Sequence, residues 1–428
     1  QQDEDVLDTW ASSWLWPITV FDGFNPDNHE IDYYYPTDDL VTAPEIIFFW
    51  VARMIMAGYE YRQAPPFRNV YFTGIVRDKY RQKMSKSLGN SPEPLELIRK
   101  YGADGVRMGM LLCSPAGNDI LFEEKLTEQG RNFANKIWNA FRLVKTWDVS
   151  DDAEQPESSA LAVEWMQNKL WQSAATIDDH FDKYRISDAL MEVYHLFWDE
   201  FSSWYLEMIK PGYQQPIDRK TLEATLRFFD DLVRLLHPFM PFITEEIWQH
   251  LDTRQEGESI MVSLQPEAKP YDKQLVDQFE HIKEAIAGVR NFRQEKNLSP
   301  REELDVKVMV GDDGYFEQLD PVFRKMANLK SIEKIDEKLQ GAVSFLVKST
   351  EYFIPMEGLI NVEEEIAKLE EELKRMEGFL TGVMKKLNNE RFVNNAPDNV
   401  VELEKKKKAD AEAKIKVLTE SIENLKNN

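Results

Sequence analysis

The most regular hydrophobic pattern in the chain lies in residues 359–428. Apolar side chains recur there at alternating spacings of three and four in two runs, and the polar stretch 388–399 between the runs contains Pro397. This heptad spacing gives each run one apolar stripe along a helix, and proline is favoured in the first turn of a helix. The pattern predicts an antiparallel coiled-coil hairpin, with a long dimerising coiled coil as the alternative. The stripe residues are Leu359, Val362, Ile366, Leu369, Leu373, Met376, Leu380, Val383 and Leu387, then Ala411, Ile415, Leu418, Ile422 and Leu425.

Residues 126–270 contain longer segments with helical periodicity. Phe133, Ile137 and Phe141 recur at spacings of four, and a second aromatic-rich set recurs at helical spacing within 190–201. Such stripes are typical of helices that bury one face. The polar stretch 148–159 is typical of a loop between helices. We therefore expect a helical bundle with short connections, in which the aromatic residues pack the core.

The first 125 residues mix strand-like and helical patterns. Residues 70–76 have the aromatic and β-branched composition of a strand, whereas 45–56 and 93–101 have helical periodicity, with Gly102 ending the second helix. This mixture predicts an α/β region.

Residues 271–358 begin with a predicted helix and continue with the alternating segments 305–310 and 343–347, which predict strands of a small α/β unit. The fold class is therefore α/β plus all-α. The expected domains are residues 1–125, 126–270, 271–358 and 359–428.

The amino-acid composition indicates in which cellular compartment the protein is expected. The chain has 428 residues and one cysteine, Cys113, which excludes a disulfide framework and any multi-cysteine metal site. A reducing compartment, most simply the cytoplasm, is expected. No apolar run approaches the ~20 residues that span a bilayer, so no membrane partner is expected, and the first residues lack a signal-peptide pattern.

Charge is distributed unevenly along the chain. The net charge of −24 argues against general affinity for polyanions. Residues 361–428, however, hold 13 basic and 15 acidic residues, and 385–408 hold seven basic against four acidic ones. The acidity therefore belongs to the body of the chain, and a local basic patch at the tip of the hairpin remains available for nucleic acid, with a solvated lysine-rich turn as the alternative.

One short motif carries chemistry. Lys83-Met84-Ser85-Lys86-Ser87 follows the strand-like run, and two lysines three residues apart in a polar loop can bring two ammonium groups to a polyphosphate. When pyrophosphate leaves, charge builds on its oxygens, and positioned cations stabilise that charge.

The context of this motif resembles the class I aminoacyl-tRNA synthetases, and within them most closely the valyl-tRNA synthetases. Isoleucyl enzymes commonly end in a cysteine-rich zinc module, which one cysteine cannot build, and leucyl enzymes lack this kind of coiled coil. The segments that resemble the family, over nearly the whole chain, are 5–13, 40–50, 83–90, 101–104, 131–139, 237–246 and 386–397.

The resemblance implies a fold and a reaction. Residues 1–125 would form the second half of a Rossmann-type catalytic domain, followed by an anticodon-binding bundle, a connecting α/β unit and a tRNA-binding arm. The intact enzyme would join valine to tRNA(Val) with ATP, as a monomer, with Mg²⁺ held mainly by the phosphates and no structural metal in the protein. A non-catalytic tRNA-binding module and half of an isoleucyl enzyme are the alternatives.

The resemblance also implies roles for single residues. Lys83 and Lys86 would be catalytic and bind the ATP phosphates, with Ser85 and Ser87 as hydrogen-bonding residues of the loop. Trp10 and Trp50 would wall the valine pocket, where rigid indole faces hold a small branched side chain by shape; ordinary core packing is the alternative.

Two departures from the family pattern affect the nucleotide site. Its adenosine turn usually contains Gly-x-Asp, where this chain has Ala43-Pro44-Glu45. We expect Glu45 to keep a carboxylate for the ribose and Ala43 to crowd the nucleotide. The family also often has glycine where Arg81 stands, so we expect a different hairpin turn.

The implied RNA-binding residues lie in two regions. In the bundle they are Arg131, Arg142 and Lys145, beside Lys136, and solvated helix charge is an equal alternative there. In the arm they are Lys385, Lys386, Arg391, Lys405 and Lys406.

A His-x-Gly-His motif, which class I catalysis also requires, does not occur among the six histidines, which are His29, His180, His195, His237, His250 and His281. We therefore expect the chain to be the C-terminal half of a synthetase about twice as long, without the editing domain, and inactive in adenylate formation by itself.

Overall fold

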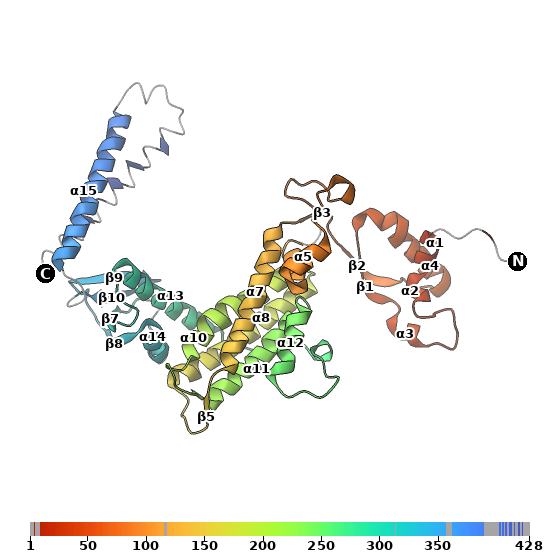
Figure 1. The fold of residues 1–428 in the computed structure, drawn as a ribbon, viewed down its shortest axis with the longest axis horizontal. Coiled ribbons are helices and arrows are strands. Elements are labelled where there is room, and N and C mark those ends of the chain that lie inside the picture. Colours follow the sequence, from red (N-terminus) through yellow and green to blue (C-terminus); the bar gives the residue numbers. More distant parts are fainter. Residues whose placement is uncertain are drawn as a thin grey trace. The chain divides into compact units, whose positions relative to one another are not determined.

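A computed structural model describes residues 4, 9–114, 118–312, 314–356 and 362–388, together with single positions between 402 and 422. The chain divides into two compact units, residues 1–276 and 277–428. Figure 1 labels their elements.

The first unit opens with an α/β segment. The short helices α1 (Thr9–Ser13), α2 (Trp16–Thr19) and α3 (Glu30–Tyr34) precede strand β1 (Thr37–Thr42). A continuous helical stretch then runs through η1 (Pro44–Ile46), the π-helical turn η2 (Ile47–Val51) and α4 (Ala52–Arg62) to strand β2 (Phe67–Phe72), which pairs parallel to β1. Parallel neighbours need such a helical crossover, and its buried side chains cover the two strands. The buried residues of this small core are Leu40, Val51, Met54 and Phe67.

This segment refines two sequence predictions. The helix expected over 45–56 is present, but it begins as a 3₁₀ turn, passes through a π turn and extends to Arg62. The strand expected over 70–76 is instead β2, which ends at Phe72. Gly74 explains the interruption, because a Cβ added there would lie 1.8 Å from the carbonyl oxygen of Asn118. Only glycine permits that approach of two backbones.

The next segment contains the lysine motif. Strand β3 (Val76–Arg77) pairs parallel to β4 (Ile120–Leu121), and between them lie the 3₁₀ turn η3 (Lys86–Leu88) and the helices α5 (Pro94–Tyr101) and α6 (Ala103–Leu112). Helix α5 ends at Gly102, as predicted, with a backbone φ of 78° that suits glycine. The core of this segment consists of Leu97, Tyr101 and Phe122.

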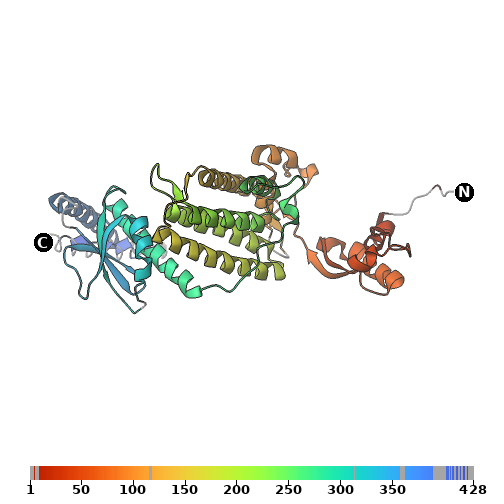
Figure 2. The same cartoon turned by 90° about the horizontal axis from the view of Figure 1, so that it is seen from below.

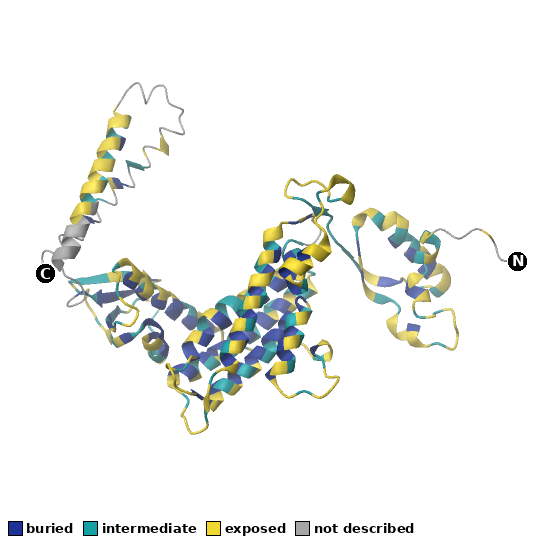
Figure 3. Cartoon of the chain, viewed as in Figure 1, coloured by how far each residue is buried: buried dark blue, intermediate teal, exposed yellow. Residues whose placement is uncertain are grey.

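A helical bundle forms the largest part of the first unit and confirms the predicted bundle (Figures 1 and 2). Aromatic side chains fill its centre: Phe201 and Phe229, for example, meet edge to face with ring centroids 5.3 Å apart. Figure 3 shows the buried interior and the exposed outer faces of the helices. The helices are α7 (Glu124–Lys145), α8 (Glu157–Asp182), α9 (Ile186–His195), the π-helical η4 (Leu196–Tyr205), α10 (Leu206–Ile209), α11 (Arg219–Leu236) and α12 (Pro241–Leu251).

Short elements connect these helices. The polar stretch 148–159 contains the two-residue strand β5 (Val149–Ser150), and α8 begins within the same stretch at Glu157. Strand β5 pairs parallel to β6 (Ile217–Asp218), which follows α10 in the chain. After α12, the chain forms the 3₁₀ turn η5 (Ile260–Val262). Helices α6 and α7 pack unusually closely, since a Cβ on Gly130 would lie 2.5 Å from the carbonyl oxygen of Gly105. This close packing ties the α/β part of the unit to its bundle.

The second unit contains a four-stranded sheet with the order β8-β7-β10-β9. Helix α13 (Lys273–Glu295) leads into it, and β7 (Leu304–Met309) pairs parallel to β8 (Leu329–Lys334) and antiparallel to β10 (Thr350–Pro355). Strand β9 (Ala342–Val347) completes the sheet, and η6 (Glu317–Leu319) and α14 (Asp320–Ala327) link β7 to β8. The strands predicted at 305–310 and 343–347 are confirmed as β7 and β9, whereas α14, β8 and β10 were not predicted.

Helix α15 (Val362–Leu387) confirms the first helix of the C-terminal pattern. Val383 is buried, and Leu373, Met376 and Leu380 are more covered than most of their neighbours, as the heptad stripe predicts. Among the single helical positions further on, Ala411, Leu418 and Ile422 are buried. The predicted turn around Pro397, together with Leu359 and Leu425, lies outside the described residues.

Candidate functional site

The lysine motif lies on a hairpin that a carboxylate organises. The chain turns at 78–82, where Arg81 N–H donates to the Asp78 carbonyl at 2.8 Å. One Asp78 carboxylate oxygen accepts from the backbone N–H groups of Tyr80 and Gln82, each at 2.9 Å. These bonds, with the Gln82 bond first, hold the pKa of Asp78 below its usual range. Arg81 has a φ of 64°, so arginine occupies here a left-handed backbone position that glycine adopts most easily.

One side of the lysine motif packs against the protein core, and the other side is exposed to solvent. Met84 packs against the core of Leu97, Tyr101 and Phe122, which fixes the loop to α5. The Ser85 hydroxyl caps η3 by accepting from Leu88 N–H at 3.3 Å and lies 3.0 Å from the Ser87 hydroxyl.

Lys83 and Lys86 are both exposed on this loop. The contacts of Met84 and Ser85 therefore hold the backbone of the motif, while the ammonium groups of Lys83 and Lys86 remain accessible to a polyphosphate. A further residue of this loop, Asn90, was not predicted from the sequence. The Asn90 side chain bonds to Ser85, Lys83 and Asp78, and the only sequence signal for it is an amide residue shortly after a Ser- and Gly-containing loop.

The expected adenosine turn follows the carboxyl end of β1. Ala43 has extended backbone (φ −89°, ψ 147°), and Glu45 lies exposed in η1. Just beyond the parallel pair, Thr73 N–H donates to the Thr42 carbonyl at 2.9 Å. Ligands of open α/β sheets bind beyond the carboxyl ends of parallel strands, which is where Glu45 stands.

The two tryptophans expected at the amino-acid pocket lie on α1 and η2, which contact each other. Trp50 packs against the core of β1, β2 and α4, its indole N–H donates to the Ser13 carbonyl at 3.2 Å, and its ring centroid lies 6.0 Å from that of Trp16. Trp10 lies 6.2 Å from the ring of Phe49. Both indoles are half-buried, and their role at a valine pocket stays a prediction.

The α/β segment before β3 exposes an unusual amount of apolar surface. Tyr33 and Phe48 are 84% and 81% exposed. Large apolar side chains that gather in one exposed patch mark an interaction face. The other exposed large side chains of this segment include Trp16, Phe24, Phe49, Met56, Tyr59 and Tyr61.

The three basic residues expected to bind RNA in the bundle lie exposed on α7. Arg131, Arg142 and Lys145 fall within about 60° of one another around the helix, over about 21 Å of its length. Their face lies away from the buried stripe of Phe133 and Ile137. Arg131 also lies 5.7 Å over the ring of Tyr101.

The basic residues of the predicted arm are partly described. Lys385 and Lys386 are exposed in the last turn of α15, and Lys405 is exposed at one of the later helical positions. Arg391 and Lys406 lie outside the described residues.

Helix α6 is joined to the start of α12 by polar contacts that the sequence did not predict. The buried Asp104 carboxylate accepts from the backbone N–H groups of Phe242 and Ile243, at 3.3 and 2.7 Å. The Arg107 guanidinium donates to the carbonyls of Phe239 and Pro238, at 3.1 and 3.0 Å. Burial raises the pKa of Asp104, with its two N–H donors acting in the opposite direction. These contacts hold the segment that carries the lysine motif on the bundle.

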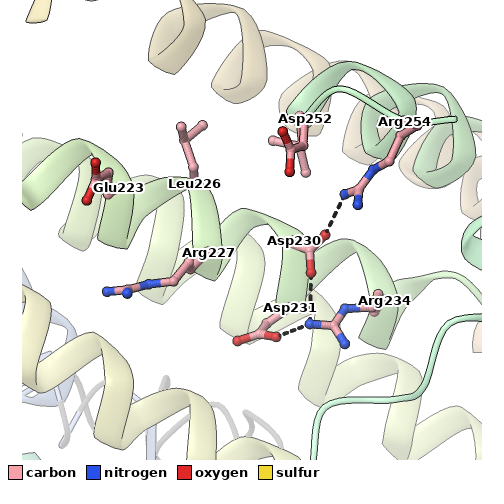
Figure 4. Close-up of a pocket in the computed structure, with 9 residues that line it drawn as sticks. Glu223, Leu226, Arg227, Asp230, Asp231, Arg234, Asp252 and Arg254 are labelled. Carbon is pink, nitrogen blue, oxygen red and sulfur yellow. Dashed lines mark hydrogen bonds and ion pairs between the residues drawn. The ribbon is translucent and has the colours of Figure 1, made fainter. Parts of the chain in front are cut away.

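A cavity of about 630 Å³ lies on the bundle beside α11 and the end of α12 (Figure 4). Its charged groups largely pair with one another: Arg234 contacts Asp230 and Asp231 at 2.8 and 2.6 Å, and Arg254 contacts Asp230 at 3.3 Å. Arg234 also donates to the Leu264 carbonyl at 2.9 Å. The network therefore fastens the loop after α12 to α11, which is a structural role.

The described part of the chain contains no group of three or more histidine, cysteine, aspartate or glutamate side chains suited to hold a metal ion. Within the same residues, every helix is too short or too polar to cross a membrane.

Three family models match separate parts of the sequence. Residues 1–123 match "tRNA synthetases class I (I, L, M and V)", residues 163–308 match "Anticodon-binding domain of tRNA ligase", and residues 361–426 match "Valyl tRNA synthetase tRNA binding arm".

Curated relatives match along almost the whole chain. A valine–tRNA ligase of Parabacteroides distasonis is 65% identical over 423 residues, which cover 99% of this chain and 48% of that protein. Another from Phocaeicola vulgatus is 62% identical over 428 residues, covering 100% and 48%, and one from Fusobacterium nucleatum is 39% identical over 442 residues, covering 98% and 49%. The chain thus spans about half the length of the curated relatives it matches.

A solved methionyl-tRNA synthetase of Mycobacterium tuberculosis, in complex with methionyl-adenylate, covers 60% of this chain and 53% of its own. It is 21% identical with a TM-score of 0.47, a likeness too weak to carry a conclusion.

Proposed function

We infer that this chain, which belongs to the valine–tRNA ligase family of class I tRNA synthetases, supplies the C-terminal half of such a ligase. The observation that carries this inference is the 65% identity across 99% of the chain. The exposed Lys83 and Lys86 on an anchored loop support it, because two ammonium groups in this position would suit the charge of a leaving pyrophosphate.

In the proposed reaction, valine and ATP form valyl-adenylate and pyrophosphate, and the valyl group then passes to tRNA(Val) with release of AMP. The carboxylate of valine attacks the α-phosphorus, and the bond to the bridging oxygen of pyrophosphate breaks. Negative charge therefore builds on the leaving pyrophosphate. Lys83 and Lys86 would stabilise that charge, and Ser85 and Ser87 would shape the loop that presents them.

The carboxylate that contacts the lysine loop belongs to Asp78. The Asp78 carboxylate already accepts bonds from Tyr80, Gln82 and Asn90. We therefore expect the phosphates, rather than protein carboxylates, to hold the Mg²⁺ that accompanies ATP.

The remaining site residues keep the roles implied by the family. Glu45 would bind the ribose hydroxyls from beyond the end of β1, beside Ala43, and Trp10 and Trp50 would contact valine. Because two apolar walls discriminate one methylene by only about 1–3 kcal/mol, selectivity against similar amino acids would need support from elsewhere in the enzyme.

The exposed apolar face before β3 supports the proposal of a larger catalytic domain. We propose that the rest of a Rossmann-type sheet covers Tyr33, Phe48 and their neighbours in the full-length ligase. In the isolated chain this face would remain open to solvent.

The tRNA would contact the bundle and the arm. Arg131, Arg142 and Lys145 give α7 a basic face for the anticodon end, where exposed bases of single-stranded RNA can stack and hydrogen-bond. The arm would be an antiparallel hairpin of α15 with the later helical positions, supported by the burial of Val383, Ala411, Leu418 and Ile422. Lys385, Lys386, Arg391, Lys405 and Lys406 would lie at its tip.

The alternative of a tRNA-binding module without catalysis describes what we expect of the 428 residues by themselves. The match of 361–426 to the valyl arm disfavours an isoleucyl enzyme. A monomeric, cytoplasmic enzyme is part of the same proposal.

Valine-dependent ATP–pyrophosphate exchange tests the proposed function. We expect exchange with the full-length ligase, and with residues 1–428 only after the N-terminal half is added. Binding of tRNA(Val) to residues 1–428 by themselves is the matching control. Exchange by the 428-residue chain without the added half would contradict the proposed division of the active site.

A further inference from the structure

Asn90 lies where the signature loop, residues 83–90, returns to the hairpin turn. Its side-chain oxygen accepts from the backbone N–H of Ser85 at 2.9 Å. Its side-chain nitrogen donates to the Lys83 carbonyl at 3.3 Å and to the Asp78 carboxylate at 3.1 Å. One half-buried side chain thus holds two backbone groups of the motif and the turn that precedes it.

The hydrogen-bonding partners fix the orientation of this amide. Ser85 N–H needs an acceptor, whereas the Lys83 carbonyl and the Asp78 carboxylate need donors. Asparagine offers an oxygen and an NH₂ group at opposite sides of one short planar group, so it satisfies all three. Alanine satisfies none, and aspartate would set a second carboxylate against Asp78.

Asp78 extends this arrangement into the turn. Its other carboxylate oxygen accepts from Tyr80 and Gln82, so the carboxylate connects the turn to Asn90. Met84 anchors the loop through apolar contacts, and its backbone N–H donates to the Val76 carbonyl at 3.1 Å. The contacts of Asn90 act on the backbone on either side of Met84 together with the bond from Met84 N–H to the Val76 carbonyl, and Lys83 and Lys86 project from this backbone into solvent.

We propose that Asn90 is a positioning residue for adenylate formation, holding the signature loop so that Lys83 and Lys86 present their ammonium groups to the leaving pyrophosphate. This inference rests on the proposed function, because it assigns Asn90 a role through the two lysines. Charge stabilisation depends on cations that are already in place when charge develops, so loosening the loop acts on turnover more than on ATP binding.

Kinetics of the full-length ligase separate positioning from binding. In ATP–pyrophosphate exchange, we expect N90A to lower kcat about 10- to 100-fold, from the loss of three hydrogen bonds, with KM for ATP and valine changed less than about threefold. Transfer of valine from preformed adenylate to tRNA should be unchanged. Ser91→Ala, an exposed neighbour, is the matched control and should behave as wild type.

A swap of the two side chains tests the contact itself. N90D should lose at least as much activity as N90A, because two carboxylates then face each other. D78N/N90D restores an amide opposite a carboxylate, and the amide oxygen introduced at position 78 can still accept from Tyr80 and Gln82. The Lys83 carbonyl alone then lacks the donor that Asn90 gave it, so the rescue is partial. We expect the double variant to recover about tenfold in kcat over N90D. A residue needed only for folding would give no such rescue at unchanged thermal stability.

Hydrogen exchange of the Ser85 amide supplies a readout that does not depend on catalysis. We expect exchange at Ser85 to be about tenfold or more faster in N90A than in wild type or Ser91→Ala. Unchanged exchange at Ser85, or unchanged kcat in N90A while Lys83→Ala is impaired, overturns the role of Asn90 and leaves the proposed function intact. If Lys83→Ala and Lys86→Ala retain full activity in ATP–pyrophosphate exchange, both the proposed function of the loop and this inference fail.

Discussion

The Asp104 carboxylate on α6 accepts a hydrogen bond of 2.7 Å from the backbone N–H of Ile243, 139 residues further along the chain. Ile243 lies in the first turn of α12, where N–H groups have no partner within the helix. A carboxylate at this position satisfies those groups and interacts favourably with the helix dipole. The contact therefore joins the segment that carries the lysine motif to the bundle.

We expect Asp104→Ala to destabilise the first unit by about 2 kcal/mol, because two backbone N–H groups lose their acceptor. Asp104→Asn keeps one acceptor oxygen and should lose less. Urea denaturation of the 428-residue chain measures both. Asp152→Ala, at an exposed loop position, is the control, and equal stability of the Asp104→Ala and wild-type proteins would contradict the capping role.

His237 gives this junction a pH dependence. Its Nδ1 lies 2.7 Å from the Thr244 hydroxyl, which itself donates to the Met240 carbonyl, so the neutral imidazole donates to Thr244. Burial is the main cause that lowers the pKa of His237; Arg107 lowers it further, while Glu245 and Asp104 act against the shift.

A histidine with a lowered folded-state pKa takes up its proton more readily when unfolded. The free energy of unfolding should therefore decrease as pH falls below about 6.5, the ordinary histidine pKa. His237→Asn keeps a donor to Thr244 but does not titrate, so its stability should decrease less over pH 7.5 to 5.5. Urea midpoints, each taken relative to the same protein at pH 7.5, measure the difference. Parallel curves for the two proteins would show that His237 is not responsible.

Helices and strands whose side chains follow a regular local pattern could be predicted from the sequence. The bundle helices and α15 each have one apolar face, and β7 alternates between buried and half-buried side chains, so their periodicity was visible. Strand β10 was missed because consecutive residues from Thr350 to Ile354 are all buried, which removes the alternation. Strand β8 is a charged edge strand with little apolar signal.

In the candidate site, too, local motifs could be predicted from the sequence, whereas contacts between distant residues could not. The lysines of 83–87 form a contiguous motif, and both are exposed as a phosphate-binding role requires. The bonds of Asn90 and Asp104 were not predicted, since they depend on how the chain returns to the loop and to α12. The role of Trp10 and Trp50 was implied by the family motif, and it stays a prediction.

Replacement of the two lysines should separate chemistry from folding. We expect Lys83→Ala and Lys86→Ala each to lower kcat of adenylate formation about 10²- to 10³-fold in the full-length ligase, the usual cost of removing one group that stabilises developing charge. Thermal stability should be unchanged because both side chains are exposed. Lys79→Ala, on the same hairpin, controls for the loss of one positive charge. A comparable loss in Lys79→Ala would indicate a general electrostatic effect instead.

Glu45 should contribute to ATP binding. If its carboxylate binds the ribose hydroxyls, Glu45→Ala loses charge-assisted hydrogen bonds and should weaken ATP binding about 10- to 100-fold. Glu45→Asp retains the carboxylate and should lose less. Equilibrium ATP binding to the full-length ligase measures this, with Glu60→Ala on α4 as an exposed control in the same segment. ATP affinity that is untouched in Glu45→Ala would rule out the role.

The arm should bind tRNA through phosphates. If Lys385 and Lys386 each neutralise one phosphate, replacing both with alanine should weaken binding of tRNA(Val) and make the plot of log K against log salt less steep by about 0.9 for each phosphate that is no longer neutralised. Fluorescence anisotropy at several salt concentrations measures the slope. The matched control is the double alanine variant of Lys374 and Arg375, which removes the same charge from exposed positions of α15 about 16 Å away along the helix. Equal slopes for the two double variants would assign the effect to the overall charge of the helix and not to its last turn.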